Sequence, residues 1–128
     1  MARQWRAGSK ARAAKIGLDL PVMPTIDEVH AHLQAADDRC CYCQVRFSRQ
    51  KNHRMTMDHG VPISRGGGAD LGNLRLCCYA CNHAKGPLLE TEFMALLDVV
   101  SRWEDAGRSL LIRLRGGYWF YRGQPATS

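Results

Sequence analysis

Residues 57–86 read MDHGVPISRGGGADLGNLRLCCYACNHAKG, and the end of this stretch contains Cys78 and Cys81, two cysteines separated by two residues. The same spacing occurs upstream in Cys40 and Cys43. Two such pairs are typical of a structural zinc site, because the short turn between the cysteines offers backbone amides to the sulfurs. We therefore predict that Cys40, Cys43, Cys78 and Cys81 bind one structural Zn2+.

The remaining two of the six cysteines are Cys41 and Cys77, and we expect them to be small buried apolar residues. The basic N-terminus is not followed by an apolar run like that of a signal peptide, and no segment approaches the roughly 20 apolar residues that span a bilayer. Paired cysteines in a reducing compartment bind metal more often than they form disulfides. We expect a cytoplasmic protein of a bacterium or a phage-infected cell, with no membrane contact. A secreted protein held by disulfides is the less favoured alternative.

The charge of the chain favours an anionic partner. Lysine and arginine number 18 against 12 acidic residues, a formal net charge of +6. Nucleic acid is the simplest partner for such a chain, although many soluble proteins are basic without binding it. Candidate nucleic-acid contacts in the central part of the chain are Arg46, Arg49, Lys51, Arg54 and Arg65.

Residues 1–24 are basic and contain two glycines and two prolines that interrupt long elements. We predict a loose N-terminal arm here, which either stays solvated or neutralises phosphates. Residues 25–128 then form a single domain, whose apolar content is ordinary for a globular protein.

Thr25 and Glu28 form a capping-box pattern that predicts the start of a helix. The alternation at residues 55–58 predicts a strand, and a short helix follows the second cysteine pair, through residues 82–85. Apolar residues at helical spacing predict a further helix at about 91–105; they are Phe93, Leu96, Leu97, Val100 and Trp103. Two strands at about 109–122 around Gly116-Gly117 complete the prediction as a C-terminal hairpin.

Three polar residues near the cysteines suit phosphodiester hydrolysis. A neutral imidazole such as that of His59 can accept a proton from water near neutral pH. A hard cation such as Mg2+ prefers oxygen ligands, and Asp58 and Asn82 supply them. Neighbouring side chains on a strand point to opposite faces, so Asp58 and His59 meet at one site only if the chain bends, which Gly60 permits.

The segment 39–86 resembles the HNH endonuclease family, which has a ββα-metal fold, and within it the zinc-knuckle subgroup of phage and bacterial nucleases. The motifs follow in the family's order. They are Cys40-x-x-Cys43, Asp58-His59-x-x-Pro62, Ser64-Arg65-Gly66-Gly67, Asn73-Leu74, Cys78-x-x-Cys81-Asn82 and Lys85-Gly86. The resemblance implies a small α+β fold with a ββα-metal core at 39–86, stapled by the four-cysteine zinc site and flanked by helices and the hairpin.

The resemblance also implies a role for each matching residue. His59 would be the general base, and Asp58 and Asn82 would hold one catalytic cation, Mg2+ or another divalent ion such as Mn2+. Asn73 would orient His59 through hydrogen bonds of the loop, and Lys85 would contact phosphate. Family members often have histidine at the position of Asn82, and the asparagine favours a harder cation than zinc. The adjacent His83 is a competing ligand.

We therefore predict a metal-dependent endonuclease that hydrolyses phosphodiester bonds of DNA, most simply double-stranded DNA. The resemblance associates such proteins with a guiding partner such as a phage packaging motor. One alternative is a zinc-ribbon module that binds nucleic acid without catalysis, and another is an RNase or toxin-like effector.

Overall fold

The computed structural model of the chain describes residues 1–102 and residue 109. The predicted C-terminal hairpin and the end of the helix expected at about 91–105 lie outside the described residues. None of the helices within the described part of the chain is both long and apolar enough to cross a membrane.

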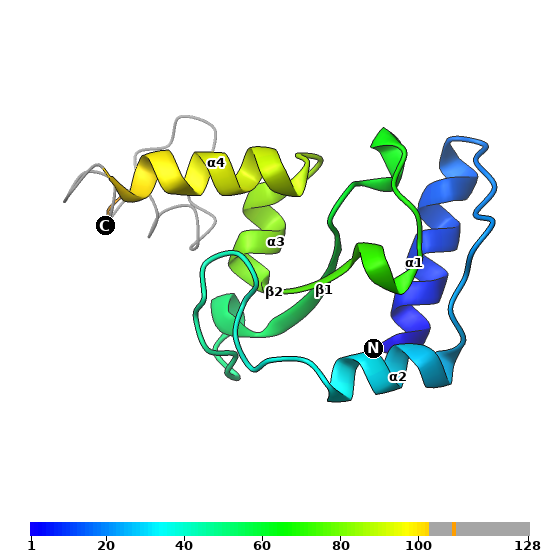
Figure 1. Ribbon diagram of the computed structural model, residues 1–128, viewed down its shortest axis with the longest axis horizontal. Coiled ribbons are helices and arrows are strands. Elements are labelled where there is room, and N and C mark those ends of the chain that lie inside the picture. The colour runs from blue at the N-terminus through cyan, green and yellow to red at the C-terminus, as the bar shows by residue number, and fades with distance from the viewer. Residues whose placement is uncertain (103–108, 110–128) are drawn as a thin grey trace.

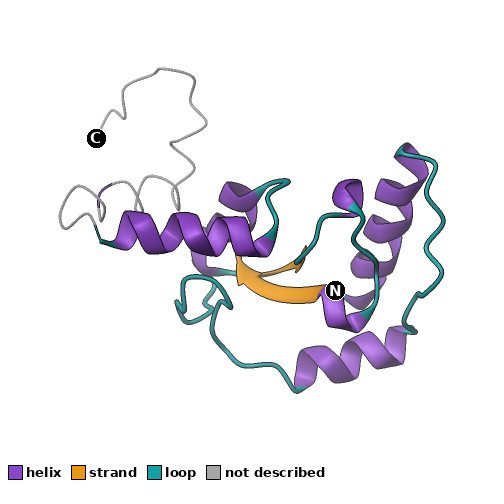
Figure 2. Ribbon diagram, turned by 45° about the horizontal axis from the view of Figure 1, so that its top comes forward, coloured by secondary structure: helices purple, strands orange, loops and turns teal. Residues whose placement is uncertain are grey.

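The centre of the fold is an antiparallel pair of strands followed at once by a helix. Strand β1 covers Met55–His59 and strand β2 covers Leu74–Cys78, with Met55 opposite Cys78 and His59 opposite Leu74. Helix α3, Tyr79–Lys85, begins where β2 ends, so the order is strand, strand, helix (Figures 1 and 2). This arrangement confirms the predicted α+β fold and its ββα core.

Helices α1 and α2 cover one face of the strand pair (Figure 1). Alternate residues of a strand point to opposite faces, and Leu74 and Leu76 of β2 pack with Trp5 of α1 and Val29 of α2. Helix α2, Ile26–Gln34, starts with the predicted capping box: Thr25 Oγ1 accepts from the Glu28 amide, and Glu28 Oε1 accepts from the Thr25 amide, each at 3.1 Å.

The N-terminal segment differs from our expectation of a loose arm. Residues Ala2–Lys15 form helix α1, which continues through Gly8. Its buried residues recur every three or four positions, as on one face of a helix; they are Ala2, Trp5, Ser9 and Ala13. Only Trp5 among them is large and apolar, so the sequence shows no obvious hydrophobic periodicity here. The segment is nevertheless part of the core.

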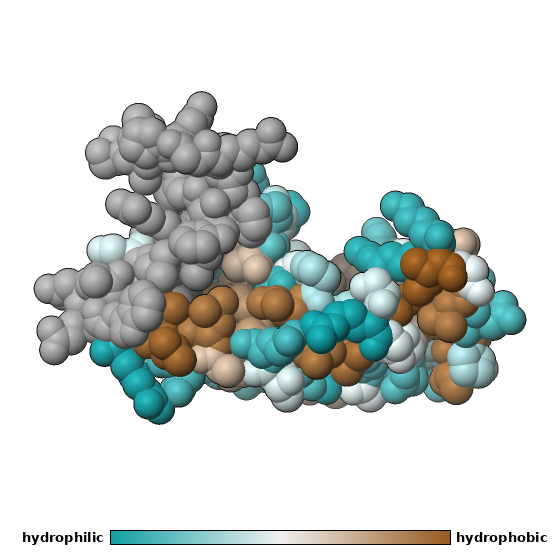
Figure 3. Space-filling model, turned by 90° about the horizontal axis from the view of Figure 1, so that it is seen from above, coloured by the Kyte–Doolittle hydropathy of each residue, from teal (hydrophilic) through white to brown (hydrophobic). Residues whose placement is uncertain are grey.

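The opposite face of the strand pair carries α3, the cysteine turns and helix α4, Glu90–Ser101. The N-cap of α4 is Leu89. Phe93 and Val100 are buried as the apolar pattern predicts, but Leu96 is exposed. Exposed apolar side chains gather along α4 and around the C-terminal end of α1 at the other end of the molecule (Figure 3); they include Met94, Leu96 and Val99, and Ile16, Leu18 and Val22.

Candidate functional site

The four cysteines of the two predicted pairs come together in a single group. Their sulfurs all lie within 4.8 Å of one another, and the members are Cys40, Cys43, Cys78 and Cys81. A zinc ion with bonds of about 2.3 Å to tetrahedral sulfurs places those sulfurs roughly 3.8 Å apart. Cys43 Sγ and Cys78 Sγ are 3.8 Å apart, which fits. Within the described residues, this is the one group of three or more His, Cys, Asp or Glu side chains placed to hold a metal.

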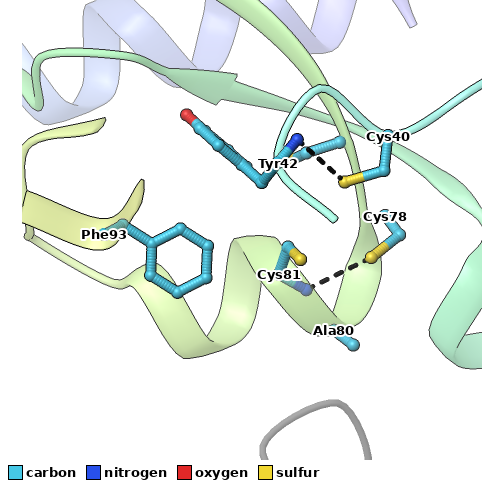
Figure 4. Packing of buried hydrophobic residues seen from close by; sticks show 7 residues of the cluster. Cys40, Tyr42, Cys78, Ala80, Cys81 and Phe93 are labelled. Atoms are coloured by element: carbon cyan, nitrogen blue, oxygen red, sulfur yellow. Dashed lines mark hydrogen bonds between the residues drawn. The ribbon is translucent and has the colours of Figure 1, made fainter. Parts of the chain in front are cut away.

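Backbone amides surround these sulfurs, as expected for short cysteine turns. The amides of Tyr42 and Cys43 donate to Cys40 Sγ, and the Cys81 amide donates to Cys78 Sγ, each at 3.4 Å. Figure 4 shows the hydrogen bonds of the Tyr42 and Cys81 amides. Hydrogen bonds from the neighbouring thiols lower the pKa of Cys40. For Cys40 both effects favour the thiolate, which is the form that binds metal, whereas hydrogen bonds within the group raise the pKa of Cys78 and of Cys81. The cysteines are therefore positioned for a structural metal site, and their all-sulfur ligand set is that of zinc.

The two leftover cysteines are outside this group. Cys77 is fully buried and Cys41 is partly buried, and burial raises the pKa of each thiol, that of Cys41 to about 12. Both remain neutral thiols at ordinary pH. They pack with the apolar residues around the four-cysteine group, as we expected.

A separate cleft of about 370 Å³ opens where β1 ends. Asp58, His59 and Asn82 all line it, although Asp58 and His59 are neighbours on a strand. Two basic residues of α1, Arg12 and Lys15, also line the cleft, so cationic groups stand beside the polar ones. The cleft thus combines a histidine, two oxygen-bearing side chains and a positive rim.

Helix α1 packs directly on the imidazole of His59. The Trp5 ring stacks on it with centroids 4.1 Å apart and planes 21° apart, and Ser9 Oγ lies 2.8 Å from His59 Nε2. Burial, followed by the positive charges of Arg12 and Lys85, lowers the pKa of His59 to about 4. The imidazole is therefore neutral at ordinary pH, which is the state that accepts a proton.

Asp58 points to the other face of β1, toward the cysteine side of the fold. Its Oδ2 accepts a hydrogen bond from the Tyr42 hydroxyl at 2.7 Å and pairs with Lys85 Nζ at 3.1 Å. Burial, and then the charge of Asp58, raise the pKa of Tyr42, so its hydroxyl stays a donor. These contacts engage Oδ2, and Oδ1 is the second carboxylate oxygen that Asp58 can offer to a cation.

The position of Lys85 differs from our prediction from the sequence. We expected its ammonium to contact phosphate, but the side chain is 0% exposed. Besides Asp58, Lys85 Nζ reaches the His59 carbonyl at 3.1 Å. The lysine therefore ties the end of α3 to the end of β1, and it does not reach the surface.

Replacing Lys85 with methionine is expected to destabilise the fold by about 3 kcal/mol, because it leaves the buried Asp58 carboxylate without its counter-charge. Chemical denaturation of the zinc-loaded protein measures the change. The double variant Lys85→Met with Asp58→Asn removes both charges and should recover part of the loss. A single variant as stable as the parent would show that the pair contributes nothing.

The amide of Asn82 has a fixed orientation in the cleft. Its Nδ2 donates to Thr56 Oγ1 at 3.0 Å and to the Met57 carbonyl at 3.1 Å. The carbonyl only accepts hydrogen bonds, so the group that faces it must be the NH2. Asn82 Oδ1 is consequently the atom left to bind a cation.

Asn73 holds the loop that follows His59. Its Oδ1 accepts from the Val61 amide at 2.8 Å, and its Nδ2 donates to the carbonyls of Val61 and Gly68 at 2.9 and 2.8 Å. Gly67 is required by the same close packing, because a Cβ there would lie 1.7 Å from the Val61 carbonyl oxygen. Asn73 thus fixes the loop after β1 without touching the imidazole through a hydrogen bond of its own.

The predicted nucleic-acid contacts fall into two groups. Arg46 pairs with Asp38, and Arg65 with Glu92, so their charges are engaged within the chain. All five side chains are exposed, and the three for which the described part of the chain shows no ion pair are Arg49, Lys51 and Arg54. Arg54 lies over the Tyr79 ring at 4.8 Å, and Lys51 approaches it at 5.6 Å.

Arg54 and Tyr79 also line a second cleft, which shares Asn82 and Gly86 with the first. Asn82 therefore forms part of the wall of both clefts. Of the predicted surface contacts, Arg54 is the one that lines this second cleft.

Sequence reasoning missed several residues of this site. Trp5, Ser9 and Arg12 were assigned to a loose arm, because nothing local links residue 9 to residue 59. No pattern in the sequence assigned a role to Tyr42, whose hydroxyl donates to Asp58. The buried α1 positions recur every three or four residues, but only Trp5 among them is large and apolar, so this spacing gives no clear helix signal in the sequence.

Comparison with known proteins agrees with the geometry. The structure combines a two-stranded sheet, a helix that follows it directly and four clustered cysteines. The HNH endonuclease family model matches residues 40–88 of the chain. This match confirms the resemblance carried by the motifs, and it indicates a nuclease-type or nucleic-acid-binding function. No curated protein matches the chain significantly.

Proposed function

We propose that this protein is a metal-dependent endonuclease that hydrolyses DNA, with His59 as the general base. The observation that supports this most is the composition of the first cleft, which is lined by His59, Asp58 and Asn82 together with Arg12 and Lys15. A binding module has no need of a neutral imidazole next to two oxygen ligands. The proposal extends the nuclease-type function that the family match indicates.

Each side chain has a defined part in the proposed hydrolysis. The neutral His59 imidazole takes a proton from the attacking water. Asp58 and Asn82 would hold one divalent cation, Mg2+ or Mn2+, through their side-chain oxygens. Mg2+ commonly uses only one or two carboxylates and keeps several waters. When bound, such a cation stabilises negative charge on the phosphate and on the leaving oxygen.

The basic residues around the cleft give the proposed path of the DNA. Arg12 and Lys15 stand on the α1 side, and Arg54 stands in the second cleft beyond Asn82. Cationic side chains on both sides of the reacting phosphate would neutralise the adjacent phosphates of the same DNA strand. Double-stranded DNA, a guiding protein and a cytoplasmic location remain predictions.

A second function has one observation in its favour. Asp58 is already hydrogen-bonded to Tyr42 and paired with Lys85, as expected of a purely structural carboxylate. A zinc module that binds nucleic acid without cutting it would show the same contacts.

A plasmid assay tests the proposal against this alternative. The zinc-loaded protein is incubated with supercoiled DNA alone and with added Mg2+, Mn2+ or Ca2+, and a structured RNA is tested in parallel. We expect relaxed or linear DNA only with an added cation. Binding of DNA without cleavage under any of these conditions would favour the non-catalytic module, and cleavage of RNA alone would favour the RNase alternative.

A further inference from the structure

Helix α1 makes the closest polar and aromatic contacts with the His59 ring. Ser9 Oγ is 2.8 Å from Nε2, and the Trp5 indole covers one face of the imidazole. Within the described residues, the contact with Ser9 is the hydrogen bond that the ring makes. An element that was expected to be a loose tail therefore supplies the immediate surroundings of the proposed base.

The contact between Ser9 and His59 is buried in the core. Ser9 is 0% exposed, Trp5 is 3% exposed, and Trp5 packs with Val29 and Leu74. The indole Nε1 donates to the Ala69 carbonyl at 2.9 Å, which anchors α1 to the loop between the two strands. Opening α1 would break this packing and expose Trp5.

The Ser9 contact bears on which imidazole nitrogen can act as a base. A neutral imidazole has one nitrogen that donates and one that accepts, and a serine hydroxyl can partner either. If Ser9 Oγ accepts from Nε2–H, the lone pair is on Nδ1. If the hydroxyl donates to Nε2, Nδ1 carries the proton and cannot accept another.

We propose that Ser9 is a positioning residue which accepts a hydrogen bond from His59 Nε2–H and so makes Nδ1 the nitrogen that takes the proton from water. This inference rests on the proposed function, because the ring needs a free lone pair on Nδ1 only if His59 acts as a general base. Trp5 assists by fixing the plane of the ring through stacking. Hydrogen bonds that orient metal-binding histidines commonly change affinity or activity by about 10- to 100-fold when removed, and we expect an effect of the same order here.

Nitrogen NMR of the imidazole tests directly which ring nitrogen of His59 carries the proton. The full-length, zinc-loaded protein is labelled with 15N-histidine and measured at neutral pH without added cation or DNA, with the His59 signals assigned by loss in His59→Asn. We expect His59 to carry its proton on Nε2. A proton on Nδ1 would overturn the proposal. Because no cleavage is measured, this result is independent of whether the proposed function holds.

A matched pair of variants tests the consequence. Ser9→Thr keeps the hydroxyl. Ser9→Val has nearly the same shape as the threonine variant but has no hydroxyl. We expect the threonine variant to stay within a few-fold of the parent in kcat, and the valine variant to fall about 10- to 100-fold with KM little changed. Equal kcat in two folded variants would overturn the role of the hydroxyl. If neither variant folds, Ser9→Ala replaces Ser9→Val, and it should lose kcat and shift the tautomer signals.

Discussion

Replacing His59 with alanine is expected to reduce DNA cleavage by about 10²- to 10⁴-fold, the usual contribution of a positioned general base. The imidazole is neutral because burial and the charges of Arg12 and Lys85 lower its pKa to about 4, so the parent enzyme has a proton acceptor at neutral pH. Alanine offers none. The rate of plasmid nicking in saturating Mg2+ or Mn2+ measures the loss.

The packing of His59 calls for a second variant. The ring is 7% exposed, stacked on Trp5 and hydrogen-bonded to Ser9, so alanine also leaves a cavity and an unpaired hydroxyl. His59→Asn keeps a polar group near Ser9 but has no basic nitrogen. We expect it to cleave as poorly as alanine while melting closer to the parent. Parental activity in the folded asparagine variant would rule out His59 as the base.

Replacing Cys78 with serine is expected to release the metal and unfold the centre of the protein. Cys78 both ends β2 and caps α3, and its sulfur belongs to the group of four that lies within 4.8 Å. Metal binding and folding are coupled in such sites, so the loss of one ligand removes a large part of the stability of a small domain. We expect the melting temperature to fall by more than about 10 °C, or the cooperative transition to disappear.

The neighbouring Cys41 gives the matched control. It lies beside Cys40 in sequence but is outside the sulfur group, and its thiol is partly buried. The Cys41→Ser variant should retain one zinc per chain by native mass spectrometry and melt within a few degrees of the parent. Full zinc content in Cys78→Ser, or loss of zinc in Cys41→Ser, would show that the ligand set is wrong.

Local patterns were sufficient for the parts of the fold that depend on local chemistry. The two cysteine spacings predicted the metal group, the Thr25–Glu28 pattern predicted the start of α2, and the alternation at residues 55–58 predicted β1. Each of these signals lies within a few residues of the feature that it specifies. The family motifs added the ββα core, which the structure and the family match confirm.

The contacts that the sequence did not reveal join distant segments. Ser9 and His59 are 50 residues apart, and the buried face of α1 is made mostly of small residues that carry no strong apolar signal. A lysine is rarely buried, so nothing marked Lys85 as the partner of Asp58. Leu96 follows the apolar spacing of its helix yet is exposed, because spacing alone does not say how wide the covered face is.

The most direct test of the whole account is a crystal structure of the zinc-loaded protein soaked in Mn2+, with anomalous data that distinguish the two metals. We predict zinc among the four sulfurs and manganese in the cleft, bound to Asn82 Oδ1 and the Asp58 carboxylate, with a ring nitrogen of His59 within reach of the metal-bound water. Manganese absent from the cleft, or bound there with His59 too far away for one water to bridge, would contradict the account.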